Sequence, residues 1–167
     1  MYTGKRVFSL NFHNGVIDFI ISEDKLVVKL GNNGENQVYQ LYKDSATYLY
    51  TFEKTYRNLV AHPININHII LDNTYNGFEI FDLESRTTIH SFKGQFQSID
   101  PISGSLLYYD ENYNYWNNMY DNRVINLSYN EVFVFEDASQ STLGAFLQFN
   151  NYIIKGDRCV NLLHKDK

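Results

Sequence analysis

One short pattern recurs four times along the chain: two apolar residues, then Gln, Asp or Asn, and then Leu. The copies are Val38-Tyr39-Gln40-Leu41, Ile80-Phe81-Asp82-Leu83, Val124-Ile125-Asn126-Leu127 and Cys159-Val160-Asn161-Leu162. Their leucines are 42, 44 and 35 residues apart. A fixed period of this size is typical of repeat architectures, in which each repeat is one supersecondary unit.

Each copy of the pattern lies among further apolar runs. A run such as LVVKL or HIILD precedes it, and a weaker run such as VIDFII or NLVAHP separates successive units. The first three copies are also followed by a run that ends in Phe52, Phe92 or Phe135. These runs are short and rich in Val, Ile, Tyr and Phe, and turns of Asn, Gly, Asp and Ser separate them, which indicates antiparallel hairpins. No sustained helical periodicity is present. We therefore predict an all-β chain with four strands per unit.

The last unit lacks a run after Leu162, and residues 5–12 (KRVFSLNF) supply a run of the missing type. This predicts that the ends of the chain share one unit and close a ring, which hides edge strands. The expected units are 15–56, 57–96, 97–141, and 142–167 together with 1–14.

The period, the four strands and the polar residue before Leu resemble the WD-repeat type of β-propeller. The resemblance is one of architecture and covers nearly the whole chain. The Trp-Asp pair is absent, with Phe81-Asp82 nearest to it, and Lys93-Gly94-Gln95 is the nearest sequence to the Gly-His element. The family's structural Asp–His–Ser/Thr network is therefore not carried over. The resemblance implies that 1–167 is a single domain, a small four-bladed β-propeller of four-stranded antiparallel blades whose N-terminal strand closes the last blade. The alternatives are an eight-bladed ring of two chains and an open β-sandwich.

Composition excludes several classes of protein. The 167 residues suffice for one domain, and 16% aromatic content argues against disorder. A single cysteine, Cys159, excludes an internal disulfide scaffold and a Cys-based zinc cluster. The balance of 14 Lys and Arg against 19 Asp and Glu, a net charge of −5, argues against nucleic acid as a partner.

The N-terminal sequence carries no uninterrupted apolar stretch of the kind that a signal peptide needs. The longest apolar stretch, residues 16–21, contains Asp18 and is too short for a membrane helix. We expect a cytoplasmic protein with no membrane partner. A mature secreted form without its leader is the alternative.

One connection between strands differs from its equivalents. The expected loop 111–121 (ENYNYWNNMYD) is longer than the others and holds the only Trp. Extra length on one face of a repeat protein often marks a binding surface, to which Tyr and Trp contribute large contact area. The predicted partner-binding residues are Tyr113, Tyr115, Trp116, Met119 and Tyr120 with Asp110, Glu111 and Asp121, together with Tyr56, Tyr75, Phe96, Glu136 and Asp137 on the same expected face. The alternative is that Trp116 anchors the loop and the Asn residues form turns.

Signals of catalysis or metal binding are weak. The spacing of His62 and His68 matches no ligand motif, so we predict no metal. Asp18 and Asp100 fall in equivalent innermost strands and could serve as paired channel carboxylates, although solvated or turn-bonded roles are the simpler interpretation. Cys159 lies in an apolar run and is interpreted as a buried thiol. The sequence contains no nucleophile, phosphate-loop or dinucleotide motif. We predict no catalytic residue and no cofactor.

The sequence favours a non-catalytic protein-binding module, as a monomer or homodimer. Its most concrete version is a stoichiometric inhibitor, an immunity protein that neutralises a cognate bacterial toxin or another basic enzyme, with acidic groups steering the encounter. The first alternative is a lectin-like propeller that binds carbohydrate or another small ligand. The second is a small hydrolase that uses the channel carboxylates.

Overall fold

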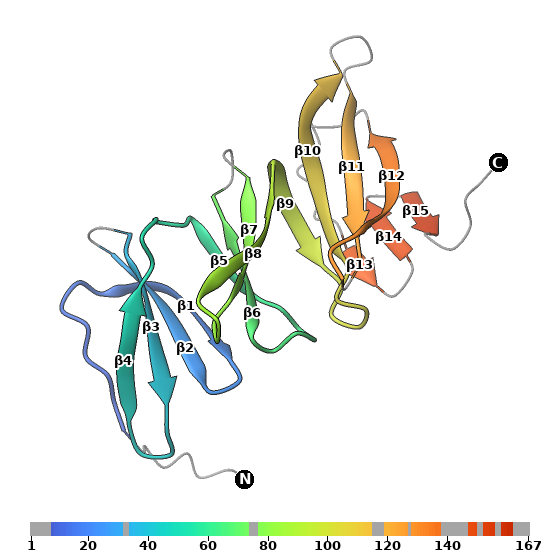
Figure 1. The fold of residues 1–167 in the computed structure, drawn as a ribbon. Helices are drawn as coiled ribbons and strands as arrows, with labels where there is room; N and C mark the ends of the chain where they lie inside the picture. The colour runs from blue at the N-terminus through green and yellow to red at the C-terminus, as the bar shows by residue number, and fades with distance from the viewer. Residues whose placement is uncertain are drawn as a thin grey trace.

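The computed structural model describes residues 8–31, 34–73, 77–114, 119–126, 128–137, 147–149, 152–155 and 158–161. Fifteen strands of these residues form four separate antiparallel sheets that follow one another in chain order (Figure 1). This confirms the expected all-β architecture of successive small sheets. Among the described residues, no helix is long and apolar enough to cross a membrane.

Each of the first three sheets has four strands, and neighbours in the sheet are neighbours in the chain. The first sheet contains β1 (Val16–Ser22), β2 (Lys25–Leu30), β3 (Asn36–Leu41) and β4 (Ala46–Thr51). The second contains β5 (Asn58–Ala61), β6 (His68–Asp72), β7 (Phe78–Asp82) and β8 (Thr87–Phe92). The third contains β9 (Gly94–Ile99), β10 (Leu106–Asn114), β11 (Met119–Ile125) and β12 (Glu131–Asp137). The fourth contains β13 (Leu147–Phe149), β14 (Tyr152–Lys155) and β15 (Arg158–Asn161).

The first two sheets pack face to face through one apolar core. Alternation along the strands places Val27 and Val38 of the first sheet on the face that meets Ile69, Leu71 and Phe81 of the second sheet. Val27, Val38, Ile69 and Leu71 have no exposed surface. Because successive side chains in a strand point to opposite faces, the neighbouring residues of the second sheet are free to form another core.

That second core joins the second sheet to the third. Ile70, Phe78 and Ile80 pack with Leu106 and Ile125. Aromatic rings fill the remaining space: Phe78 stacks on Phe92 at a centroid distance of 4.8 Å and meets Tyr108 edge-on at 5.4 Å. The central strands of the second sheet, β6 and β7, are therefore buried on both faces.

The connection between the second and third sheets is very short. Only Lys93 separates β8 from β9. Gly94 follows with φ +131°, and a Cβ at this position would lie 1.9 Å from the backbone oxygen of Tyr109. A side chain cannot be accommodated there, so the start of β9 pairs this closely with β10 because residue 94 is glycine. β9 thus begins within the unit that we expected over 57–96.

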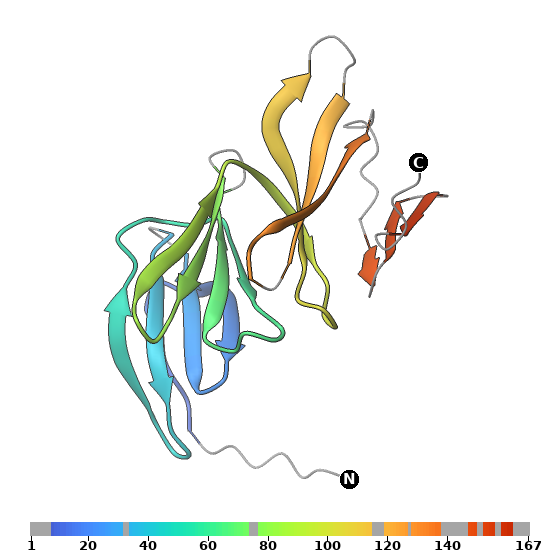
Figure 2. The same cartoon turned by 45° about the vertical axis from the view of Figure 1, so that its right-hand side comes forward.

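The four sheets form a row whose ends do not meet. The first sheet and β13–β15 lie at opposite ends in both views (Figures 1 and 2). The expected closing strand, residues 5–12, is only partly described: residues 8–12 form no strand, and Phe12 packs edge-on against Tyr39 of β3 at 5.6 Å. The fourth sheet has three strands among the described residues. Strand exchange within one chain is therefore not observed.

Candidate functional site

The predicted binding loop is largely a pair of strands. β10 runs to Asn114 and β11 begins at Met119, and the two strands form a long hairpin that extends beyond the second sheet in Figure 1. Residues 115–118 lie outside the described residues. The ladder continues to Tyr113 opposite Tyr120 and Asn114 opposite Met119, after an irregularity between Tyr109 and Tyr113. The expectation of a loop over 111–121 was wrong for its described residues, because 111–114 and 119–121 belong to β10 and β11.

The ladder brings predicted residues from three segments to one end of the third sheet. Across the β11–β12 pair, Tyr120 stands opposite Asp137 and Asp121 opposite Glu136. Tyr113 of β10 stands opposite Tyr120 on the other side of β11. We call this end of the sheet the hairpin end and define it by Glu111, Tyr113, Met119, Tyr120, Asp121, Glu136 and Asp137. Tyr115 and Trp116 lie outside the described residues, as does Tyr75.

Three predicted residues have other surroundings. Tyr56 is buried, and its ring belongs to the core between the first two sheets. Phe96 is half-buried and packs 5.7 Å from the ring of Phe78 in the second core. Asp110 forms an ion pair with Arg123, with 2.7 Å between Nε of the arginine and Oδ2 of the aspartate. Arg123 also forms an ion pair with Glu131. Tyr56 was expected as a surface contact, but the tight packing of the linker after β4 turns its ring inward.

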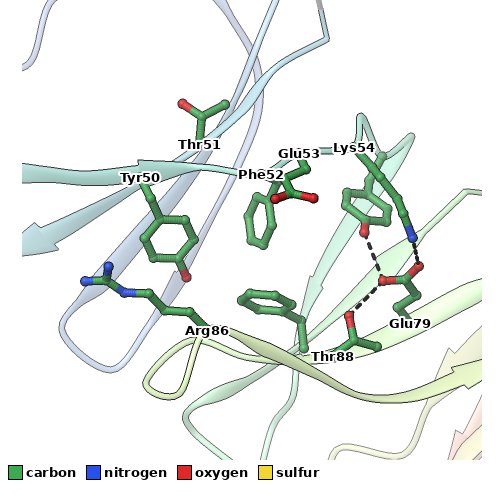
Figure 3. A pocket seen from close by; sticks show the side chains of 10 residues that line it. Tyr50, Thr51, Phe52, Glu53, Lys54, Glu79, Arg86 and Thr88 are labelled. Carbon is green, nitrogen blue, oxygen red and sulfur yellow. Dashed lines mark hydrogen bonds and ion pairs between the residues drawn. The ribbon is translucent and has the colours of Figure 1, made fainter.

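Sequence reasoning missed a groove along the seam between the first two sheets, which we call the Glu79 groove (Figure 3). Its volume is about 410 Å³. Glu79 of β7 accepts hydrogen bonds from three donors: Lys54 Nζ at 2.7 Å, Tyr56 Oη at 3.0 Å and Thr88 Oγ1 at 3.0 Å. The walls are aromatic, and the guanidinium of Arg86 lies 4.9 Å from the centre of the Tyr50 ring. The signal in the sequence was a glutamate between the apolar residues Phe78 and Ile80.

The electrostatics of the Glu79 groove keep its carboxylate charged. Burial raises the pKa of Glu79, but the hydrogen bonds from Lys54, Thr88 and Tyr56 outweigh burial and lower it overall. Burial and the bond to Glu79 raise the pKa of Tyr56. Burial raises the pKa of Tyr50 to about 12, although Arg86 opposes the shift. A carboxylate that accepts three hydrogen bonds and two phenols that stay protonated are suited to binding rather than to proton transfer.

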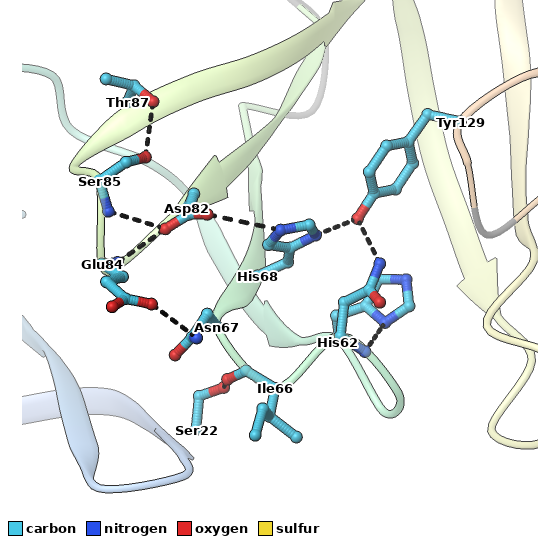
Figure 4. A network of polar contacts seen from close by, with 11 residues as sticks. Ser22, His62, Ile66, Asn67, His68, Asp82, Glu84, Ser85, Thr87 and Tyr129 are labelled. Atoms are coloured by element: carbon cyan, nitrogen blue, oxygen red, sulfur yellow. Dashed lines mark hydrogen bonds and ion pairs between the residues drawn. The ribbon is translucent and has the colours of Figure 1, made fainter.

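A second polar network joins the second and third sheets near the turn between β11 and β12, at the end of the third sheet opposite to the hairpin end (Figure 4). Tyr129, from the turn between β11 and β12, lies 2.5 Å from Nδ1 of His68 and accepts a bond from Asn65 Nδ2 at 3.2 Å. Nε2 of His68 lies 3.6 Å from Asp82. His62 accepts backbone N–H groups from residues 64 and 65 at its Nδ1, at 3.2 and 3.0 Å.

Burial controls the charge of both histidines in this network. It lowers the pKa of His62 to about 4, with a further contribution from His68. Burial also lowers the pKa of His68, against the opposing effect of Asp82. Neutral His68 can accept the Tyr129 hydroxyl proton at Nδ1 while Nε2 donates toward Asp82. Because burial also raises the pKa of Tyr129, the hydroxyl is a poor nucleophile, and the network serves to link the sheets.

The proposed channel carboxylates do not form a pair of equivalent groups. Asp100 is fully buried and caps a turn: Oδ1 accepts the Ile102 N–H at 3.0 Å and Oδ2 accepts the Ser103 hydroxyl at 2.6 Å. Asp18 is exposed on β1 and binds the N–H of Phe19. Within the part of the chain that the structure describes, no cluster of three His, Cys, Asp or Glu side chains could hold a metal ion.

Comparison with known proteins bears on the fold. No protein-family model and no curated protein sequence matches the chain. Several solved structures match the chain in fold. The computationally designed Ika4 protein aligns over 95% of this chain and 99% of its own, with 12% identity and a TM-score of 0.63. The WD40 β-propeller domain of Doa1 aligns over 92% of this chain and 52% of its own, with 14% identity and a TM-score of 0.52. BamB from Moraxella catarrhalis aligns over 92% and 47%, with 12% identity and a TM-score of 0.53.

The chain has a β-propeller-like architecture. This confirms the resemblance that its repeats indicate, and at these identities the likeness concerns the fold alone. The chain spans about half the length of the Doa1 and BamB chains that it matches.

Proposed function

We propose that the protein is a non-catalytic protein-interaction module and that the hairpin end is its recognition surface. The observation that carries this proposal is the register of β10, β11 and β12, which places Tyr113, Tyr120 and Asp137 in one row. Tyrosines next to acidic residues on paired strands offer contact area at low entropic cost together with charge for specificity.

The charge pattern at the hairpin end favours a basic partner. Asp121 and Glu136 stand directly opposite each other in the ladder. Like charges at opposite positions of a sheet are destabilising, and a cationic group from a partner would relieve that repulsion. The net charge of −5 would also speed the encounter with a basic protein.

The more specific form of the proposal is a stoichiometric inhibitor, an immunity protein that covers the active site of a basic toxin. The acidic residues of the hairpin end and the small size of the chain support this form of the proposal. The Glu79 groove agrees with a non-catalytic role, because its carboxylate and phenols are not prepared for proton transfer. Such an inhibitor must bind one-to-one and must abolish the activity of its partner at equimolar concentration.

The test begins with affinity capture from the native host and identification of the partner by mass spectrometry. Calorimetry with the purified partner then compares the wild type with the double variant Asp121→Lys/Glu136→Lys and with Trp116→Ala. We expect a one-to-one complex whose Kd rises about 10- to 100-fold in each variant.

The matched control for the charge change is Asp44→Lys, at an exposed turn of the first sheet. Its affinity should equal that of the wild type. Unchanged affinity in both the double variant and Trp116→Ala would place the interface elsewhere. A partner that keeps full activity when saturated would rule out the inhibitor and leave only the interaction module.

A further inference from the structure

The first sheet has an unusual apolar surface on its innermost strand. Ile17, Phe19 and Ile21 of β1 are 61%, 58% and 55% exposed. By register, Phe19 pairs with Val28 and Ile21 with Leu26, so these residues share one face of the β1–β2 hairpin, which we call the outer face. The large exposed fractions on this face belong to β1, because Val28 of β2 is 1% exposed. The alternate residues Ile20 and Val27 point the other way and pack in the core with the second sheet.

The outer face is placed where a neighbouring sheet would lie. The second sheet is covered on one side by the first and on the other by the third. The first sheet has the same apolar alternation but is covered by a sheet on one side only. The difference lies in the missing neighbour and not in the composition of the strand, because β1 contributes apolar residues to both of its faces.

At the opposite end of the row, the described residues form a sheet of three strands rather than four. β15 pairs with β14 and with no other strand among the described residues. The sequence supplies an outer-strand run before β1, in residues 5–12. The part of this segment that the structure describes lies on the outer face, because Phe12 contacts Tyr39, which is opposite Leu26 in the β2–β3 ladder. The segment therefore leaves the first sheet on the side that needs a neighbour.

The curvature of the row decides between closing within one chain and closing with another. The four sheets superpose on about half of the Doa1 and BamB propellers, while 92% of this chain is aligned in each case. A row that follows half of a large ring cannot bring its own ends together. The same row aligns with 99% of the Ika4 chain. A whole chain of similar size therefore has this arrangement, and it is not found solely as part of longer propeller chains.

We propose that a second copy of this chain completes the ring, giving a two-fold symmetric propeller of eight blades. The outer face of each first sheet packs against the fourth sheet of the other copy, and the segment 5–12 becomes the outer strand beside β15 of that copy. One symmetry operation covers both apolar faces and both open edges, which is the closure that propellers and symmetric dimers use. Eight blades lie within the known range of propeller sizes.

The test measures the mass of the purified chain in solution by light scattering coupled to size exclusion. We expect about twice the chain mass of 19.6 kDa. The double variant Phe19→Lys/Ile21→Lys should elute as a monomer, with its dimer dissociation constant raised at least about 100-fold. Both side chains are more than half exposed in the single chain, so the variant should keep its β-sheet circular dichroism. Deletion of residues 2–12 should also give a monomer.

The control is Ile102→Lys, at an apolar residue that is 54% exposed in the turn after β9. It should remain dimeric. A wild type that stays monomeric at about 100 μM, or a dimer that survives both the double substitution and the deletion, would overturn the proposal. The outcome is independent of the proposed function, because a monomer could still bind a partner through the hairpin end.

Discussion

The first and second sheets have the same strand order and the same apolar alternation, yet their surroundings differ. Ile70 and Ile80 of the second sheet are fully buried against the third sheet, whereas Phe19 and Ile21 of the first sheet are more than half exposed. An alternating strand specifies two apolar faces, and only its neighbours determine whether a face becomes core or interface. The following predictions test how far this difference extends.

The largest difference should appear when one isoleucine of each sheet is truncated. Ile80→Ala removes a fully buried side chain and should lower the free energy of unfolding by about 3 kcal/mol. Ile21→Ala, measured in dilute protein where the chain is monomeric, should change it by less than about 0.5 kcal/mol. Urea denaturation gives both values. Equal losses would mean that the outer face is covered in the single chain.

The second sheet should also make stability depend on pH. The pKa of His62 is lowered to about 4 and that of His68 is lowered as well, so the unfolded chain binds protons first as the pH falls. Stability should be full above about pH 6.5 and fall between pH 6.5 and 4, by roughly 2 kcal/mol. His62→Asn should flatten this dependence. His13→Asn, at an exposed turn before the first sheet, should leave it as in the wild type.

The contact between the first and second sheets depends on Glu79. Glu79→Gln should cost about 1–2 kcal/mol, because the buried hydroxyl of Tyr56 and the hydroxyl of Thr88 lose a charged acceptor. The exposed Lys54 should contribute little of this. Thermal unfolding followed by circular dichroism measures the loss. The control Asp44→Asn lies at an exposed turn and should change stability by less than about 0.5 kcal/mol. A loss of equal size in both variants would contradict the role of Glu79.

The smallest effect should come from the link between the second and third sheets. Tyr129→Phe removes the hydroxyl that lies between His68 and Asn65 and should cost about 1 kcal/mol. Tyr42→Phe removes a hydroxyl from an exposed ring and should have no measurable effect. If Tyr129→Phe is equally silent in denaturant titrations, the polar network adds nothing to the apolar core beside it.

The repeat pattern was sufficient to predict the sheets. Each copy of the pattern falls in a third strand, as Val38 to Leu41 does in β3 and Ile80 to Asp82 in β7. Local alternation and turn residues carry this information because both act within a few residues of each other. The curvature of the row depends on contacts between sheets, such as the packing of Phe78 against Tyr108, and no local pattern reports it.

The candidate site was predicted less well. Composition identified the residues of the hairpin end, but Asn-rich sequence was interpreted as loop because Asn favours turns, and the ladder of β10 and β11 overrode that preference. The burial of Tyr56 could not be foreseen, since its partner Glu79 is 23 residues away in the chain. The acceptor role of Glu79 itself arises only when the first two sheets meet.

The single-residue junction at Lys93 determines where the chain could tolerate new sequence. A peptide inserted between Lys93 and Gly94 would have to lengthen a one-residue connection between two sheets that pack through a shared core, whereas the turn at residues 43–45 ends in solvent. In a library of random insertions selected for folded protein, survivors should therefore be frequent between β3 and β4 and depleted between β8 and β9. Tags, reporters or cleavage sites belong in the first of these positions.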